Sequence, residues 1–226
     1  PLLERHGRGI KPTDAGAMLV EYYRQHTSHQ QDVLSKLNDI RGMARGNIDI
    51  VLGEGFVGDL MGDPIQAFWQ EHPGLSITMR LASTNDVMRA VAEDQAHLGL
   101  VYNAPMVSGI RTRAVVRQPM CAVTRPHHAP TQMSRQPLLK HVLDYPVALM
   151  QAAFGTRQVI ELSAQMDRLV LVPKLITDSI SVIKHFVRAD LGVGLLPAFA
   201  VTQELPSGEL LAIPIDHPNM PKHTQH

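Results

Sequence analysis

The sequence has 226 residues, of which 44% are hydrophobic and 19% are charged, a balance typical of a globular chain that can bury a core. Its formal net charge is zero, which excludes a general electrostatic attraction to nucleic acid, so any contact with DNA must be local. The single cysteine, Cys121, excludes an internal disulfide and fits a reducing compartment, and no apolar run reaches the ~20 residues that a membrane-spanning helix needs.

The first 42 residues predict a short basic turn followed by a long helix. Residues 1–11 contain "RHGRGIK", with two glycines that suit a tight turn, and are too few to form a core. From 12 to 42, "PTDAG" offers capping residues for a helix, and apolar or aromatic residues then recur every three or four positions. This stripe includes Leu19, Tyr22, Val33, Leu37 and Ile40. Such a narrow stripe is typical of a surface helix lying along its own domain or of a helix paired with a second copy, and we favour pairing.

The next part of the chain alternates between strands and helices. Apolar runs predict strands at 48–53, 72–82 and 97–102, with a helical stretch containing Leu60–Trp69 and a helix at 83–95 between them. Two further short strands are expected at 110–116 and 119–125. Strands that alternate with helices favour a parallel sheet with crossover helices, and hence an α/β fold.

A second series of the same kind follows a connection rich in proline and histidine at 126–137. Strands are expected at 145–150, 169–176, 192–197 and 209–215, and helices at 154–166 and 178–192. The sequence therefore predicts two consecutive α/β units with their boundary at this connection.

Motifs that carry catalysis, metal binding or cofactor binding are absent from the sequence. It contains no GxSxG, P-loop, HExxH or CxxC pattern. The twelve histidines do not have the spacing of a zinc site, and Cys121 lies inside an apolar strand, which indicates a buried and inert thiol. We therefore expect neither an enzyme nor a metal site nor a cofactor.

Four strand-to-helix junctions instead carry small and polar residues, at 53–59, 82–87, 150–158 and 176–181. In an open parallel sheet, ligands bind beyond the carboxyl ends of the strands, where helix N-termini offer free amides. Two junctions fall in each half, so one ligand could be held between the halves. The groups available to it are the hydroxyls, the amide and the guanidinium of Ser83, Thr84, Thr177, Ser179, Gln151 and Arg157. The alternative is that the hydroxyls are ordinary helix caps and that Arg157 is solvated.

Three segments of the chain resemble the LysR-type transcriptional regulators. "LLERHGRGIKPTDAG" resembles the end of their winged helix-turn-helix domain and the start of their linker helix. "FVRADLG" and "GVGLLPAFAV…GELLAIPI" resemble their glycine- and proline-containing segment and a strand near the C-terminus. The similarity runs in order over essentially the whole chain.

The resemblance implies two Rossmann-like subdomains of the type 2 periplasmic-binding-protein fold, preceded by a long linker helix. It implies the following division: 1–11 as the wing, 12–42 as the linker and dimerisation helix, 47–125 plus 197–226 as effector-binding subdomain I, and 126–196 as subdomain II. A helix-turn-helix is then expected before residue 1, and a last strand and helix after residue 226.

The resemblance also implies a cytoplasmic bacterial regulator that binds a small effector in its cleft, with a carboxylate or an amino acid expected as that effector. Its DNA contacts would lie in the N-terminal domain and in the wing residues Arg5, Arg8 and Lys11, for which a plain basic turn is the alternative. Homo-oligomers, dimers or tetramers, are expected. The main alternative function is a periplasmic solute-binding protein of a transporter, which shares the fold.

Family effector contacts, carried over where the junctions match, fall on Gly53, Glu54, Gly55, Phe56, Ser83, Thr84, Asn85, Met150, Gln151, Phe154, Gly155, Thr177, Asp178, Val193 and Gly194. Arg157 is added as a partner for a carboxylate. The acid at position 54 departs from the hydroxyl residue that the family often has after its first strand, and it weakens the expectation of a simple anion there.

Overall fold

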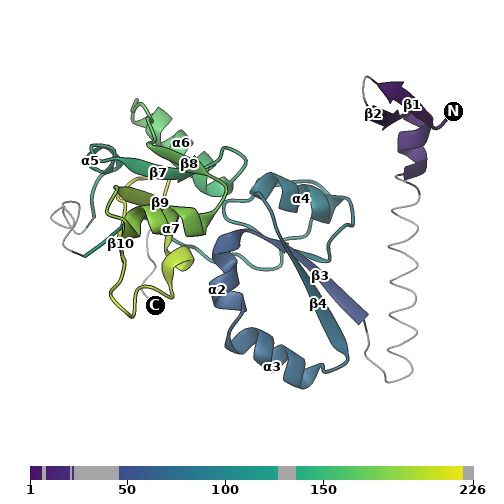
Figure 1. The fold of residues 1–226 in the computed structure, drawn as a ribbon, viewed down its shortest axis with the longest axis horizontal. Coiled ribbons are helices and arrows are strands. Elements are labelled where there is room, and N and C mark those ends of the chain that lie inside the picture. Colours follow the sequence, from purple (N-terminus) through teal and green to yellow (C-terminus); the bar gives the residue numbers. More distant parts are fainter. Residues whose placement is uncertain (7–8, 21, 23–45, 127–135, 221–226) are drawn as a thin grey trace.

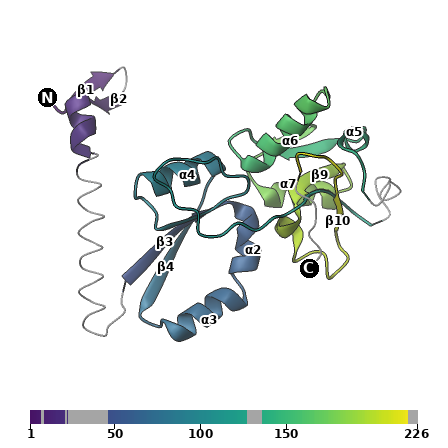
Figure 2. The same ribbon diagram turned by 180° about the vertical axis from the view of Figure 1, so that it is seen from behind.

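The computed structural model describes residues 1–6, 9–20, 22, 46–126 and 136–220. These residues form a small N-terminal hairpin and two lobes, each built around its own sheet (Figure 1). The reverse view shows the same two lobes side by side, with the hairpin beyond the first lobe (Figure 2). Among the described residues, no helix is both long and apolar enough to cross a bilayer.

The N-terminal hairpin consists of β1 (Leu3–His6) and β2 (Gly9–Pro12), which pair antiparallel. Residues 14–20 are helical, and the Thr13 hydroxyl accepts a hydrogen bond from the Gly16 amide at 3.1 Å, which confirms the predicted cap. The rest of the predicted helix to residue 42 lies almost entirely outside the described residues.

The first lobe has a parallel three-stranded sheet in the order β4-β3-β5. Its elements are β3 (Gly46–Leu52), η1 (Glu54–Phe56), α2 (Val57–Leu60), α3 (Asp63–Glu71), β4 (Leu75–Leu81), α4 (Thr84–Ala92) and β5 (Leu98–Leu100). The buried core is small and joins α4 to the sheet through Val51, Val87, Ala90 and Ala96. The predicted alternation of strands and helices is confirmed in this lobe.

The second lobe has a mixed five-stranded sheet in the order β10-β6-β9-β7-β8. Its elements are β6 (Met120–Thr124), α5 (Leu139–Val142), β7 (Val147–Met150), α6 (Gly155–Met166), β8 (Leu175–Thr177), α7 (Ile180–Arg188), β9 (Val193–Pro197), η3 (Ala198–Val201) and β10 (Leu211–Pro214). Strand β7 is parallel to β8 and β9, whereas β6 is antiparallel to β9 and β10.

The second lobe is buried on both faces of its sheet. Along β6, Met120 and Ala122 pack in the cluster that contains residues of α5 and α6, while Cys121 and Val123 pack in the cluster that contains residues of α7. This alternation is the period of two expected of a strand, and it explains why a fully apolar run occupies the middle of the sheet.

The strand pairing corrects the predicted division between the lobes. The division implied by the family resemblance placed 119–125 and 197–226 with the first lobe, but β6 and β10 pair with each other in the second sheet. An apolar strand such as β6 needs cover on both faces and a partner on each edge, and these are supplied by the helices of the second lobe together with β9 and β10. Within the C-terminal segment, η3 contacts η1 of the first lobe.

Two predicted strands are wrong or too long. Residues 111–119 carry no strand, and Val115 and Val116 are 80% and 75% exposed. Of the predicted strand at 169–176, only the end belongs to β8. Apolar alternation produces a strand only where a neighbouring strand satisfies its backbone, and among the described residues no strand pairs with 111–119 or with 169–174.

Candidate functional site

The four predicted junctions lie where the two lobes meet. In the first lobe, β3 leads into η1 and β4 leads into α4; in the second, β7 leads into α6 and β8 into α7. Each sheet contains a pair of parallel strands, so the carboxyl ends of those two strands lie at one edge of each lobe. Hydrogen bonds between the lobes show that these two edges face each other.

The N-termini of α4 and α6 are joined directly. The Thr84 hydroxyl accepts a hydrogen bond from the Gly155 amide at 2.8 Å, and both residues are buried. The Asn85 amide donates to the carbonyl of Ala153 at 3.3 Å, and the Gln158 side chain donates to the Asn85 side chain at 3.4 Å. Thr84, Asn85 and Gly155, three of the predicted effector contacts, therefore meet at one contact between the lobes, and their binding of an effector stays a prediction.

Gly155 has no space for a larger residue at this contact. A Cβ atom there would meet the backbone carbonyl of Tyr102, which lies two residues after β5 of the first lobe. The close approach of the two backbones is therefore a reason for glycine at the first position of α6.

The second junction pair is joined by Glu54. Its carboxylate accepts hydrogen bonds from the amides of Ile180 and Ser181, at 2.5 and 3.1 Å, at the start of α7. The hydroxyls of Ser181 and Ser179 donate to the same carboxylate at 2.5 and 3.4 Å. The negative charge lies where the helix dipole and the free amides favour it.

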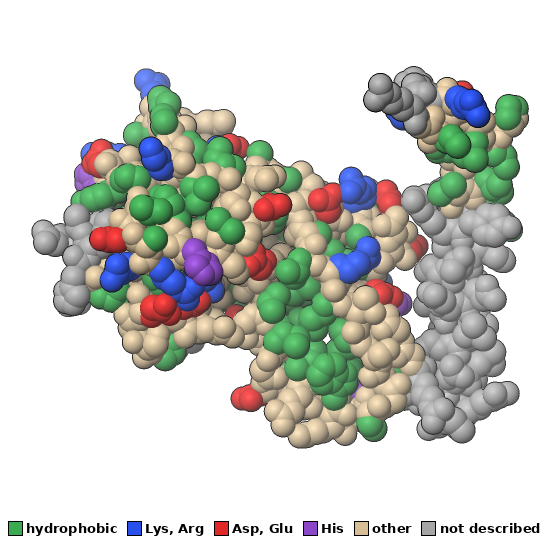
Figure 3. Space-filling model, viewed as in Figure 1, with side chains coloured by type: hydrophobic (Ala, Val, Ile, Leu, Met, Phe, Trp, Pro, Cys, Tyr) green, Lys and Arg blue, Asp and Glu red, His purple; other side chains and the backbone are tan. Residues whose placement is uncertain are grey.

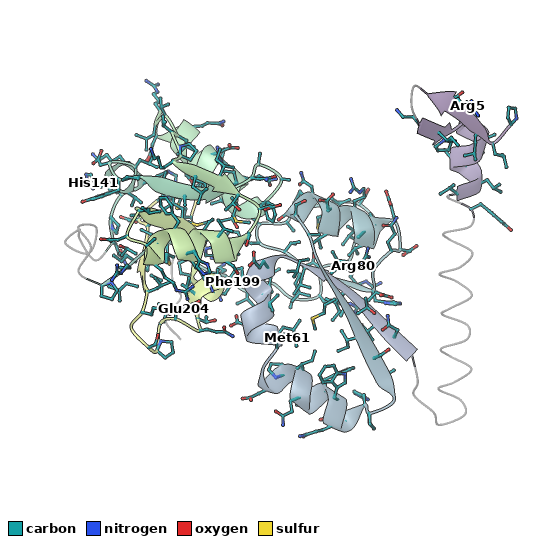
Figure 4. All side chains as sticks on the ribbon, in the orientation of Figure 1. Arg5, Met61, Arg80, His141, Phe199 and Glu204 are labelled. Carbon is teal, nitrogen blue, oxygen red and sulfur yellow. The ribbon has the colours of Figure 1, made fainter. Side chains whose placement is uncertain are left out.

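Aromatic and small residues fill the space next to Glu54. The rings of Phe56 and Phe199 are stacked with centroids 4.4 Å apart, and the Tyr102 ring lies 5.9 Å from that of Phe199. A Cβ atom on Gly55 would lie 2.7 Å from the Phe199 ring and 3.1 Å from Ile180. Figure 4 labels Phe199 on the side of the second lobe that faces α2.

Phe199 was missed by the sequence analysis. It follows β9, and because β9 is parallel to β7, its carboxyl end opens at the same edge as the predicted junctions. The signal was present in "GVGLLPAF", where Pro197 ends the strand, but this stretch was matched to the family only as a motif.

Several predicted hydroxyl residues act as local caps. Ser83 accepts from the Asp86 amide at 3.2 Å, Ser179 from the Val182 amide at 3.4 Å, and Thr177 from the Ser179 amide at 3.1 Å. These are the bonds that the alternative interpretation, ordinary helix capping, requires. The Gly53 amide is likewise bonded within its own lobe, to the carbonyl of Leu100.

Arg157 forms an ion pair within its own helix. Its Nε donates to Glu161 at 2.8 Å, its Nη1 reaches the carbonyl of Met150 at 3.5 Å, and only 12% of the side chain is exposed. The side chain is therefore not simply solvated, and its role as a partner for an effector carboxylate stays a prediction. Asp178 and Gln151 are exposed at the same edge.

Three predicted effector contacts lie in the core of the second lobe. Val193 and Gly194 pair with Val147 and Ala148 at the amino end of their parallel strands, at the opposite end from the junctions. Val193 is fully buried, and a Cβ on Gly194 would lie 2.6 Å from Ile183 of α7. Met150 is buried in the same way, and Phe154 packs against its cluster. For Val193 and Gly194, the motif match gave their position in the chain but did not show that they lie at the amino end of β9.

The predicted DNA and dimer contacts are described only in part. Arg5 and Lys11 are exposed on the hairpin, and Leu19 and Tyr22 are exposed on the helical segment. Arg8, Val33, Leu37 and Ile40 lie outside the described residues.

Two ionisable groups lie in the interior of the second lobe and at its border. Burial raises the pKa of the Cys121 thiol to about 12, and burial together with Cys121 raises the pKa of Tyr102 to about 12. A neutral buried thiol is a poor nucleophile. Within the described ranges, no group of three or more histidine, cysteine or acidic side chains could hold a metal ion.

Comparison with known proteins places the whole arrangement in one family. Residues 41–225 match the model of the LysR substrate binding domain. The HTH-type transcriptional activator CmpR of Synechocystis is 24% identical over 226 residues, which is 99% of this chain and 73% of that protein. YfiE of Escherichia coli, an uncharacterized HTH-type transcriptional regulator, is 26% identical over 94% of this chain and 71% of its own length.

Solved structures show the same fold. The regulatory domain of Synechocystis CcmR in complex with 2-PG has a TM-score of 0.66 at 16% identity, covering 78% of this chain and 85% of that one. The effector binding domain of QuiR in complex with shikimate has a TM-score of 0.63 at 16% identity, over 79% and 83% of the two chains. HinK of Pseudomonas aeruginosa, a LysR family regulator, has a TM-score of 0.64 at 19% identity, over 94% and 72%.

The predicted family and fold are therefore confirmed, and the matched relatives are named as regulators, not as enzymes or transport proteins. The chain belongs to the LysR family and carries the substrate-binding domain of a LysR-type transcriptional regulator.

Proposed function

We propose that this regulator binds a small effector at the edge where its two lobes meet and passes the resulting change to DNA-binding heads through a rearrangement of its oligomer. The observation that carries the proposal is the hydrogen bond between Thr84 and Gly155, which joins helix N-termini from the two lobes. A ligand at this edge would change the contact between the lobes, and such a change can be transmitted to the rest of an assembly.

The chemistry of the edge supports a small polar effector. Backbone amides and hydroxyls at the starts of α4 and α6 converge there, which suits carboxylate and hydroxyl groups, whereas the first amides of α7 are already bonded to Glu54. A carboxylate or an amino acid remains the class that we propose. The cytoplasm is the expected location of a protein that acts on DNA.

A thermal-shift screen of amino acids, aromatic acids and small carboxylates, with shikimate included, tests binding. A hit should raise the unfolding temperature of the wild type and should have less effect on Thr84→Val and Asn85→Ala. With the full-length protein, the same compound should change the DNA footprint or bend. If a compound binds at the edge and leaves both unchanged, the switching part of the proposal is wrong.

We also infer that the chain forms homo-oligomers. A groove of about 550 Å³ on the first lobe is lined by Met61 and Gly62, which follow α2, and by residues of α3 that include Ile65 and Trp69. The second lobe exposes Leu162 and Met166 on α6. Figure 3 shows apolar side chains gathered over the region of α2, α3 and β4. Apolar surfaces on different lobes would both be covered if two copies lay side by side in opposite directions.

Light scattering after size exclusion tests this arrangement. Trp69→Arg and Met166→Arg should each shift the protein toward smaller species, because both would place a charge in an apolar contact. Gln136→Arg, an exposed position outside these surfaces, is the matched control. A wild-type protein that is monomeric at all concentrations would contradict the inference.

A further inference from the structure

Glu54 supplies the helix α7 of the other lobe with a partner that the helix itself cannot provide. The first amides of any helix lack an intrahelical acceptor. In α7, the Val182 and Ile183 amides bond to the side chain and carbonyl of Ser179, whereas the Ile180 and Ser181 amides bond to Glu54. The carboxylate thus completes the N-terminus of a helix that lies more than 120 residues further along the chain.

The turn that carries Glu54 is fitted into the second lobe. Gly55 leaves no space for a Cβ against Phe199 and Ile180, and Phe56 stacks on Phe199. Three consecutive residues of η1 therefore contact the second lobe, by a charge-assisted hydrogen bond, by close packing and by ring stacking. Three different contacts from neighbouring residues are expected where two lobes pack specifically against each other.

We propose that Glu54 is an internal anion that holds the two lobes closed when no effector is bound. The carboxylate takes the position at the α7 N-terminus that an external anion would otherwise favour, so the protein closes this part of its edge with its own side chain. The regulatory meaning of this closure rests on the proposed function, since an effector then acts on lobes that are already joined at α7.

The test measures lobe separation without effector or DNA, so its outcome is independent of the proposed function. Spin labels at Glu71→Cys in α3 and Gln165→Cys in α6, both exposed positions on different lobes, report the distance between the lobes. Cys121 is buried and does not compete for the label. Labelled chains are diluted with unlabelled ones, so that only distances within one chain are measured.

With Glu54 intact, one narrow distance distribution is expected. Glu54→Ala and Glu54→Gln should add longer distances, and the amides of Ile180 and Ser181 should exchange with solvent hydrogen about tenfold faster or more. Gln cannot replace Glu because its amide group would oppose the donors of α7. Glu54→Asp, which keeps the charge on a shorter side chain, should lie between the wild type and these variants.

Two matched variants test whether any loss of a cap on α7, or of another polar contact between the lobes, would also change the distance between the lobes. Ser179→Ala removes a cap of α7 together with the longest of the hydrogen bonds to Glu54, at 3.4 Å, but leaves the shorter bonds to Ile180 and Ser181 in place. Asp59→Asn weakens the hydrogen bond that Thr202 donates to Asp59 at 2.8 Å. Both should keep the wild-type distance distribution. If the Glu54 variants are folded by circular dichroism and their distances are unchanged, the proposal is wrong. Faster amide exchange alone would make Glu54 only a cap, and would also overturn it.

Discussion

The hydroxyl of Thr84 and the backbone amide of Gly155 are hydrogen-bonded at 2.8 Å across the border between the two lobes, although 71 positions separate them in the chain. Both are buried, so this bond replaces water for a hydroxyl and for the first amide of α6. The contact brings together two helix N-termini that the sequence had identified one at a time.

Replacing Thr84 with Val tests how much this hydrogen bond contributes to the free energy of unfolding. The shape of the side chain is kept, but the Gly155 amide loses its acceptor in a buried place, and the free energy of unfolding should fall by about 1–3 kcal/mol. Urea denaturation measures the change. The control is Thr78→Val, because Thr78 is exposed and its hydroxyl donates to the exposed side chain of Asn47. Equal effects of the two substitutions would contradict this account.

Adding a single methyl group at Gly155 should push the two lobes apart where the N-termini of α4 and α6 meet. In Gly155→Ala the new Cβ meets the carbonyl of Tyr102, and the backbone must move, at an expected cost of about 1–3 kcal/mol of stability. In Gly46→Ala the new Cβ would lie 3.7 Å from Leu75, an ordinary contact, so little change is expected there. Thermal unfolding compares the two, and a stable Gly155→Ala protein would show that the backbones are not in close contact.

A nearly buried ion pair holds α7 to the turn after η3. Glu204 lies 2.9 Å from Lys184 and 3.3 Å from Arg188, and its side chain is only 10% exposed. Figure 4 labels Glu204 below α7. Glu204→Gln leaves the Lys184 cation without a charged partner in a place of low exposure, and stability should fall by about 3 kcal/mol in denaturant unfolding.

The neighbouring Glu209 provides the comparison for that variant. It pairs with the same Arg188 at 2.7 Å, which lowers the pKa of its carboxyl, but its side chain is half exposed. Solvent screens such a pair, so Glu209→Gln should cost clearly less than Glu204→Gln. The reverse order would show that the exposed pair, and not Glu204, holds α7 in place.

Alkaline pH should destabilise the protein through Cys121. Its pKa is raised by burial from an ordinary 9.0 to about 12, so the folded thiol stays protonated where the unfolded thiol ionises. The unfolded state then binds fewer protons, and stability is complete below about pH 9 and is lost as the pH rises. From about pH 8 to about pH 10 the wild type should lose about 1.4 kcal/mol more than Cys121→Ala.

The control for this prediction is the same pair of proteins compared at neutral pH and below, where any difference between them should be constant. Denaturant unfolding at each pH gives both values. Parallel losses of the two proteins above pH 9 would mean that the thiol ionises freely in the folded state.

Local features of the chain were predictable from sequence. Thr13 and Ser83 cap the helices that follow them, the strands β7 and β9 lie within the apolar runs that predicted them, and β3 overlaps its predicted run. These features depend on residues a few positions apart, so spacing and residue type are sufficient to identify them. The family also follows from the sequence, because its motifs are contiguous segments such as "PTDAG".

The sequence did not predict which strands pair with each other. The spacing that suggested a strand at 110–116 does not say whether another strand is available to pair with it, and the apolar run of β6 does not say which sheet it enters. The motif that contains Val193 and Gly194 does not say that they lie at the core end of β9, away from the junctions.

The sequence by itself determined most of the helices and strands, the caps at Thr13 and Ser83 and the four junctions, since each depends on neighbours within one or two turns of chain. The tertiary structure alone decided that β10 pairs with β6 and that Thr84 bonds to Gly155. It also decided that Glu54 accepts a hydrogen bond from the amide of Ser181 at the start of α7, 127 positions further along the chain. Contacts over such distances exist only once the chain between them has folded, because they depend on how both lobes pack and not on any local pattern.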